Sequence, residues 1–286
     1  MTETLDVLDH LDERQFQLAV RRLADTLSYG SDASPFLGAG IEYVQSRLYV
    51  PGDAVKSIDW RITARSGRVH VKEYEAPKRL PIYIVLDTSA SMTVTSHAMS
   101  KYAWAVQLAG GMALAALSRL SPVGLIGCGE RDLRVRPSLS RLQVYQWLHK
   151  LRHFRLDERT TLSRALREAE PMMENRSLLL VLSDLHDQDA LGVLKPLARK
   201  HDCVVLQLQD PAERGHVRGG LFRAEEAESG AGFVSHGRSA WIDPHAIGHE
   251  LSHAGIDHMR LGTDEHFLPH LRAFLRRRDC LGRAAR

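Results

Sequence analysis

The sequence predicts a doubly wound α/β protein with a mostly parallel sheet flanked by helices. Short apolar runs, which are typical of strands buried on both faces, alternate with longer segments of helical spacing. The runs cover residues 82–86, 123–127, 178–182 and 203–208. The runs at 82–86 and 178–182 lead into Asp87 and Asp184, at the position where open α/β sheets bind ligands. Strand and helix in alternation indicate a sheet of this class.

Segments with helical spacing separate these runs. They cover residues 98–120, 140–153, 161–174, 189–200, 244–254 and 265–278. In the first, Gly110-Gly111 would let a neighbouring element approach closely, and Ser121-Pro122 ends the segment. Residues 210–237 are rich in Gly, Glu, Arg and Ala, and we expect them to be irregular. Ser239–Ile242 is expected to form a last short strand.

The N-terminal part has a different pattern, so we expect two regions, residues 1–79 and 80–286. Residues 3–28 show helical spacing, and Gly30–Gly40 is expected to be a loop. Residues 41–75 predict a small β-rich segment. Its basic residues favour a solvated strand face over a nucleic-acid patch, because no aromatic residues group as a stacking platform. These basic residues are Arg47, Lys56, Arg61, Arg65, Arg68 and Lys72, together with Lys78 and Arg79 just after the segment.

The composition is that of an ordinary globular protein. Of its 286 residues, 44% are hydrophobic and 26% charged, with a net charge of +3. This balance gives no reason to expect a nucleic-acid partner. Three widely spaced cysteines, Cys128, Cys203 and Cys280, indicate no disulfide framework, and the N-terminus lacks the features of a signal peptide. No apolar stretch is long enough for a membrane span. We therefore expect a cytoplasmic protein.

Oxygen donors gather where two of the predicted strands end. Asp87, Ser89 and Ser91 follow the first apolar run, and Asp184 follows the run at 178–182. Thr160 or Thr161 begins a helix that precedes the run at 178–182. Hard cations such as Mg²⁺ prefer oxygen ligands, so these residues predict a metal site at one edge of the sheet. An Asp followed by two serines is also typical of a helix N-cap, which is the structural alternative.

These residues resemble the metal-ion-dependent adhesion site of the von Willebrand factor A domain. On that resemblance Asp87, Ser89, Ser91, Thr160 and Asp184 correspond to its five positions. The two glycines that usually precede the threonine are here Glu158-Arg159. Thr161 therefore remains the alternative to Thr160.

A second resemblance covers about residues 40–92. Arg47-Leu48-Tyr49-Val50-Pro51-Gly52-Asp53 is followed by Ile58-Asp59-Trp60-Arg61, by Ala64-Arg65 and by the Asp87 turn. This order is similar to the bacterial domain-of-unknown-function 58 family (DUF58). The resemblance implies a von Willebrand A-like fold and a non-enzymatic, metal-dependent binding module that uses Mg²⁺ or Mn²⁺. It also implies a MoxR-type AAA+ ATPase as partner, in macromolecular assembly, metal insertion or stress response.

We expect a structural role for the stretch Ile58-Asp59-Trp60-Arg61. We expect Asp59 to pair with Arg61 or Arg65 and Trp60 to form an apolar plug between the β-rich segment and the sheet.

Two further functions compete with the binding module. His249-Glu250-Leu251-Ser252-His253 matches the His-Glu-x-x-His pattern of zinc metalloproteases, in which two histidines on one helix face bind zinc. No third ligand is evident. An aspartyl-phosphate enzyme would use Asp87 as nucleophile, but no lysine is obviously placed for it. A structural scaffold with an unused metal site is the remaining alternative.

Overall fold

The computed structural model describes residues 13–28, 42–75, 80–173, 175–214, 221–225, 232–236 and 244–280. Its strands are β1 (Glu42–Leu48), β2 (His70–Glu75), β3 (Ile82–Leu86), β4 (Val123–Gly127), β5 (Arg134–Ser138), β6 (Leu178–Ser183), β7 (Asp202–Gln209), β8 (Leu221–Glu225), β9 (Gly232–His236) and β10 (Asp257–Gly262). Its α-helices are α2 (Glu13–Ser28), α3 (Trp60–Ser66), α4 (Lys101–Ser118), α5 (Arg141–Arg152), α6 (Leu162–Ala169), α7 (Ala190–Lys200), α8 (Pro244–His253) and α9 (Leu268–Cys280).

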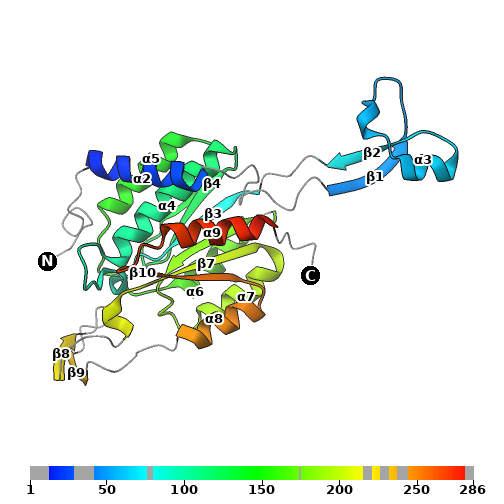
Figure 1. Cartoon of the computed structure of the whole chain (residues 1–286). Coiled ribbons are helices and arrows are strands. Elements are labelled where there is room, and N and C mark those ends of the chain that lie inside the picture. Colours follow the sequence, from blue (N-terminus) through cyan, green and yellow to red (C-terminus); the bar gives the residue numbers. More distant parts are fainter. Residues whose placement is uncertain are drawn as a thin grey trace.

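The central element is a six-stranded sheet with the order β10-β7-β6-β3-β4-β5 (Figure 1). All neighbouring strands run parallel except β5, which pairs antiparallel with β4. Helices cover both faces of the sheet. The expected fold class, a mostly parallel doubly wound α/β sheet flanked by helices, is therefore confirmed, and it is consistent with a von Willebrand A-like fold.

Each central strand contributes to two hydrophobic layers because its side chains alternate between faces. Ile82, Ile84 and Leu86 of β3 pack in one layer with residues of α2, α4, α5 and α9. Tyr83 and Val85 point to the other layer, which contains residues of α6, α7 and α8. Since both faces are covered, the strands read as continuous apolar runs, which is why the sequence revealed them.

Two glycines allow α2 to lie against α4. A Cβ atom at Gly110 would lie 2.9 Å from a methyl carbon of Val20, and one at Gly111 would lie 2.6 Å from Leu23. The close approach expected at this glycine pair is confirmed. Helix α2 thereby covers α4, which is buried along most of its length.

The β-rich segment contains a helix that the sequence analysis did not predict. Strands β1 and β2 pair antiparallel, and α3 lies between them in the chain. Asp59 begins α3, because its side chain accepts hydrogen bonds from the backbone N–H groups of Arg61 and Ile62. The expected pairing of Asp59 with an arginine side chain is therefore wrong.

Trp60 is also placed differently from the expectation. Its side chain is 68% exposed, so it does not plug the space between this segment and the sheet. Figure 1 shows β1, α3 and β2 as a small unit that projects away from the six-stranded sheet. We call residues 42–75 the projecting unit.

Two C-terminal segments also differ from expectation. Within 210–237, which we expected to be irregular, β8 and β9 form an antiparallel hairpin. The last strand of the main sheet is β10, which the sequence analysis did not identify as a strand. The strand expected at Ser239–Ile242, the loop at Gly30–Gly40 and the first residues of the N-terminal helix lie outside the described residues. Among the described helices, none is long and apolar enough to cross a membrane.

Candidate metal centre

The predicted site lies where the strand order reverses. From β3 the chain passes through α4 to β4 on one side, and it later returns to β6 on the other side of β3. Ligands of doubly wound sheets bind outside the carboxyl ends of the strands at such a switch point. Asp87 directly follows β3, and Asp184 directly follows β6. Parallel pairing of these two strands is what brings the two carboxylates to the same edge.

Hydrogen-bond donors from three segments surround the Asp87 carboxylate. The Ser89 backbone N–H donates to Oδ1 over 3.1 Å, which closes a tight turn after β3. The Ser183 hydroxyl donates to Oδ2 over 2.6 Å, and the Thr160 hydroxyl donates to the same oxygen over 3.3 Å. Asp87 itself has no exposed surface. Its carboxylate is therefore fixed from β3, β6 and the loop before α6.

The two serines connect this carboxylate to Asp184. Ser89 Oγ and Ser91 Oγ lie 3.0 Å apart, and the Ser91 hydroxyl donates to Asp184 Oδ2 over 2.9 Å. The structure thus brings all five predicted residues, Asp87, Ser89, Ser91, Thr160 and Asp184, into one hydrogen-bonded cluster. Neither serine side chain caps the short turn of helix at Ala90–Thr93. These two hydroxyls therefore do not act as helix caps, which was the structural alternative.

The two threonines have different positions. Thr160 reaches Asp87, whereas the Thr161 hydroxyl donates to the backbone carbonyl of Gly129 over 2.7 Å. Of the two alternatives, Thr160 is the one at the cluster.

Glu158 explains how this loop holds its position without two glycines. Its backbone carbonyl accepts from the Ala90 N–H over 2.8 Å, and its side chain is almost fully buried. The carboxylate lies directly over Gly129, where an added Cβ would be 1.7 Å from Oε2. A glycine on the neighbouring loop therefore provides the space for this glutamate. Burial raises the pKa of Glu158.

A buried lysine, which the sequence analysis missed, joins the cluster. Lys101, in the first turn of α4, donates to Asp184 Oδ2 over 2.7 Å and also to Glu213 Oε1. The Lys101 side chain has no exposed surface, and that of Glu213 is 15% exposed. One sequence signal was present: Lys101 begins an otherwise apolar helix that carries no acid in its first turn. The acidic partners lie 83 and 112 residues away, so no local pattern connects them.

The two aspartates differ in their electrostatic surroundings. Burial and the nearby charge of Asp184 raise the pKa of Asp87 to about 6, against the hydrogen bonds from Ser183 and Ser89. Burial alone would raise the pKa of Asp184 as well, but the Lys101 ammonium group holds it below its ordinary value. No cation among the described residues forms an ion pair with Asp87. One buried carboxylate is thus neutralised by the protein, and the other is not.

These residues fit a hard divalent cation. The donors are three hydroxyls and two carboxylates, all of them oxygen, which is the ligand type that Mg²⁺ and Mn²⁺ prefer. The uncompensated carboxylate of Asp87 is the group whose burial a bound cation would offset.

Asp187 and Asp189, which follow Asp184, lie at the starts of two helices. Asp189 is the N-cap residue of α7, and its backbone N–H donates to Asp187 Oδ1 over 2.9 Å. Asp187 Oδ2 also accepts the Ser163 backbone N–H over 2.7 Å, at the start of α6. His186 lies at the rim of the cluster, with its Nδ1 3.4 Å from Asp184 Oδ2.

The His-Glu-x-x-His sequence lies on α8, as expected. The rings of His249 and His253 have their centroids 4.4 Å apart, and both residues are exposed. Glu250 forms an ion pair with Lys195 over 2.8 Å. Among the described residues, neither histidine belongs to a group of three possible metal ligands. The third ligand that a zinc protease needs is not found in this part of the chain.

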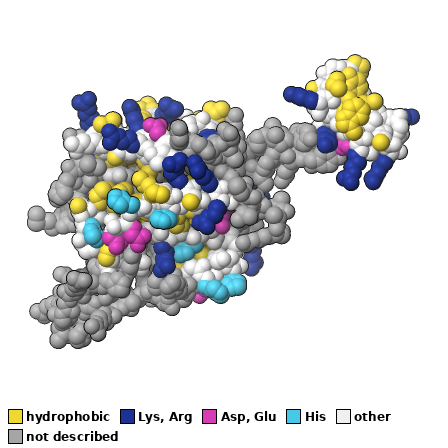
Figure 2. Space-filling model, viewed as in Figure 1, with side chains coloured by type: hydrophobic (Ala, Val, Ile, Leu, Met, Phe, Trp, Pro, Cys, Tyr) yellow, Lys and Arg dark blue, Asp and Glu magenta, His cyan; other side chains and the backbone are white. Residues whose placement is uncertain are grey.

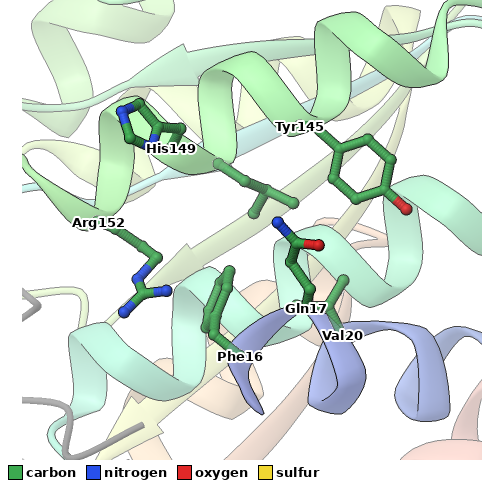
Figure 3. Close-up of a pocket in the computed structure, with 7 residues that line it drawn as sticks. Phe16, Gln17, Val20, Tyr145, His149 and Arg152 are labelled. Carbon is green, nitrogen blue, oxygen red and sulfur yellow. The ribbon is translucent and has the colours of Figure 1, made fainter. Parts of the chain in front are cut away.

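A recess elsewhere in the molecule lies between α2 and α5 (Figure 3). Phe16, Tyr145 and Arg152 line it, and the Arg152 guanidinium lies 4.7 Å from the centre of the Phe16 ring. Arg21 of α2 donates to the Tyr145 hydroxyl over 3.4 Å. These contacts hold the first helix against α5.

The chain matches the family described as "Protein of unknown function DUF58" over residues 45–238. It belongs to the DUF58 family. The matched residues include most of the projecting unit and all five residues of the cluster. Uncharacterized proteins of Mycobacterium bovis and Mycobacterium tuberculosis are each 27% identical to it over 222 residues, which is 76% of this chain and 70% of theirs.

A solved structure, titled as an uncharacterized membrane-spanning protein from Vibrio fischeri, is 15% identical. The comparison covers 68% of this chain and 96% of that one, with a TM-score of 0.25. A TM-score this low gives no basis for comparing the two folds.

Proposed function

We propose that this DUF58 protein is a non-enzymatic binding module that captures a protein partner through Mg²⁺ or Mn²⁺ at the Asp87 cluster. The observation that carries the proposal is the convergence of Asp87, Thr160 and Asp184, with two serines between them, at the switch point of the sheet. Ser89, Ser91 and Thr160 would bind the ion directly. Asp87 and Asp184 would accept hydrogen bonds from its water ligands, or would each coordinate the ion themselves. The ion would supply an electrophilic position for a partner's carboxylate.

The accessibility of the five residues supports one side of approach. Asp87, Ser89, Ser91 and Asp184 are buried, whereas Thr160 is half-buried. A partner's carboxylate would therefore reach the site from the Thr160 side. The partner class that we propose is the one implied by the resemblance stated from the sequence, a cytoplasmic MoxR-type AAA+ ATPase acting in assembly, metal insertion or stress response.

The enclosure of Asp87 argues against an aspartyl-phosphate enzyme. A nucleophilic carboxylate has to be reached by the phosphoryl group, but that of Asp87 has no exposed surface and accepts three hydrogen bonds. The lysine that such enzymes need is present as Lys101, yet it is bonded to Asp184 and Glu213. We therefore prefer binding to catalysis.

A metal titration tests the proposal. Chelator-stripped protein is titrated with Mg²⁺, Mn²⁺, Ca²⁺ and Zn²⁺ by calorimetry, and thermal melts are recorded with and without each ion. Thr160→Val removes one proposed ligand at nearly constant shape, and Thr161→Val is the matched control, because its hydroxyl bonds to Gly129 instead. We expect Mg²⁺ or Mn²⁺ binding in the wild type and in Thr161→Val, and a loss of at least about tenfold in affinity in Thr160→Val, which corresponds to about 1.4 kcal/mol.

Partner capture is tested separately. A purified MoxR-type AAA+ ATPase is mixed with the immobilised protein in Mg²⁺ and again in chelator. Capture in Mg²⁺ that disappears in chelator and in Thr160→Val supports the module. Metal binding without capture would favour a scaffold with an unused site, and tight Zn²⁺ binding lost in His249→Ala would favour the protease.

A further inference from the structure

The projecting unit exposes an unusual amount of apolar surface. In the part of the chain that the structure describes, ten large hydrophobic residues are exposed, and six of these lie between residues 48 and 69. They are Leu48, Tyr49, Val50, Val55, Trp60 and Val69. Figure 2 shows hydrophobic side chains gathered in a patch over this unit, with Lys and Arg side chains beside it. Single exposed hydrophobic residues are common on protein surfaces, but a contiguous patch marks an interaction site.

The charged side chains around this patch that are described and exposed are all cationic. Lys56, Arg61, Arg65 and Arg68 are exposed, and among the described residues none of them forms an ion pair.

The acids of the unit whose side chains are described are occupied internally. Asp53 accepts two hydrogen bonds from the Arg47 guanidinium, at 2.7 and 2.8 Å. Asp59 caps α3 and accepts from the Ser46 hydroxyl over 2.9 Å. The described surface of the unit therefore offers apolar side chains and cations, with no exposed carboxylate.

This combination matches a surface that is anionic outside and apolar beneath. Four of the six patch residues are aliphatic and cannot stack on nucleobases, which weighs against nucleic acid. Trp, Tyr and Arg are enriched at protein interfaces as well, but charged residues are depleted from the core of such interfaces, whereas four exposed cations accompany this patch. Trp and Tyr beside Lys and Arg are typical of side chains that lie at the boundary between lipid headgroups and acyl chains.

We propose that the projecting unit docks on anionic lipid membranes. Trp60, Tyr49 and the neighbouring aliphatic side chains enter the interfacial region. The long side chains of Lys56, Arg61, Arg65 and Arg68 keep their charges at the phosphate level. Because the unit projects from the sheet (Figure 1), it reaches a planar surface ahead of the main body. This docking is independent of the metal cluster and leaves that cluster free for a partner.

Vesicle flotation with the full chain tests the proposal. The probes are vesicles of pure phosphatidylcholine and vesicles in which part of it is replaced by phosphatidylglycerol. The test variant is Trp60→Ala/Val55→Ser, which alters two positions that are each 68% exposed. The matched control is Leu142→Ser on α5, where the side chain is 67% exposed. Arg61→Gln/Arg65→Gln tests the charges.

We expect the wild type and Leu142→Ser to float with the anionic vesicles and to release as salt rises, since surface charges are screened. Trp60→Ala/Val55→Ser should lose at least about tenfold in vesicle affinity, and Arg61→Gln/Arg65→Gln should lose both affinity and salt dependence. The wild type should also show a blue shift of tryptophan fluorescence on vesicles that is missing in Trp60→Phe.

Two results would overturn the proposal. One is a wild-type chain that floats with neither vesicle, including the case in which Trp60→Ala/Val55→Ser abolishes capture of a protein or a nucleic acid instead. The other is flotation that survives unchanged in Trp60→Ala/Val55→Ser, because lipid would then bind elsewhere on the molecule.

Discussion

The Asp87 cluster and the projecting unit depart from ordinary burial in opposite directions. Around Asp87, charged and hydroxyl side chains are buried at the edge of the main sheet. On the projecting unit, Trp60 and five other large hydrophobic residues are exposed. Folded proteins tolerate buried polar groups when hydrogen bonds satisfy them, and the cluster supplies such bonds from β3, β6, α4 and the loop before α6. No comparable compensation covers the exposed apolar residues, so the projecting unit is better explained by contact with something else.

The largest expected loss of stability comes from removing the buried cation that compensates Asp184. Lys101→Met removes the buried cation at nearly constant volume and leaves Asp184 and Glu213 facing each other. Removing one partner of a buried ion pair costs about 3–5 kcal/mol, so we expect a loss of that size in the free energy of unfolding, measured in urea. Lys195→Met is the control, because its pair with Glu250 is exposed and should contribute less than about 1 kcal/mol. Equal losses in the two variants would show that burial gives this pair no special role.

A second variant removes the space on which the cluster depends. Gly129→Ala would place a Cβ atom 1.7 Å from Glu158 Oε2 and 2.5 Å from Thr88 Oγ1, both of which are buried. We expect a loss of about 1–3 kcal/mol in unfolding free energy, as for other overpacked sites. Gly192→Ala on α7 meets no atom within 4 Å and should stabilise the protein by up to about 1 kcal/mol. A neutral Gly129→Ala would mean that the Glu158 loop can move without cost.

A third prediction concerns how the stability of the fold depends on pH through His258, which lies next to the cluster. Burial and Arg260 lower the pKa of His258 to about 4, and its Nε2 lies 3.0 Å from Gln207 Oε1. Because the folded state disfavours the charged ring, stability is fully present above the unfolded pKa near 6.5 and is lost as pH falls toward 4.

The matching variant is His258→Gln, which keeps a hydrogen-bond donor but does not titrate. Its unfolding free energy, relative to that of the wild type, should rise by about 1–2 kcal/mol between pH 7.5 and pH 4.5, after allowance for the partial exposure of the ring. His270→Gln, at an exposed position of α9, controls for loss of a histidine. A constant difference across this range would contradict the prediction.

The smallest expected change in stability comes from a substitution on the projecting unit. Trp60→Ala should change the unfolding free energy by less than about 0.5 kcal/mol, because the side chain is 68% exposed. Trp147→Ala, at a position that is 1% exposed, should cost about 3–5 kcal/mol. A large loss for Trp60→Ala in the same melts would mean that Trp60 supports the fold and is no free docking residue.

Several errors of the sequence analysis share a physical cause. The projecting unit was expected to be β-rich throughout because Tyr, Val, Ile and Trp favour strands, and β1 and β2 follow that preference. Asp59 overrides it locally, since its carboxylate caps α3. Asp187 lies just before α7 in the chain, yet it also accepts the Ser163 backbone N–H at the start of α6. A contact of this kind joins segments that are distant in sequence, so it is decided by the fold.

The sequence by itself determined the four buried strands β3, β4, β6 and β7, the helices between them, the two strand-end aspartates and the serines after Asp87. These features are local, because periodicity and strand-end chemistry appear within a few residues. Only the tertiary structure decided that Lys101 and Glu213 join Asp184, that Thr160 and not Thr161 reaches Asp87, and that Trp60 faces solvent. Each of these depends on contacts between segments far apart in the chain, and their energies are set by burial, which the linear pattern does not contain.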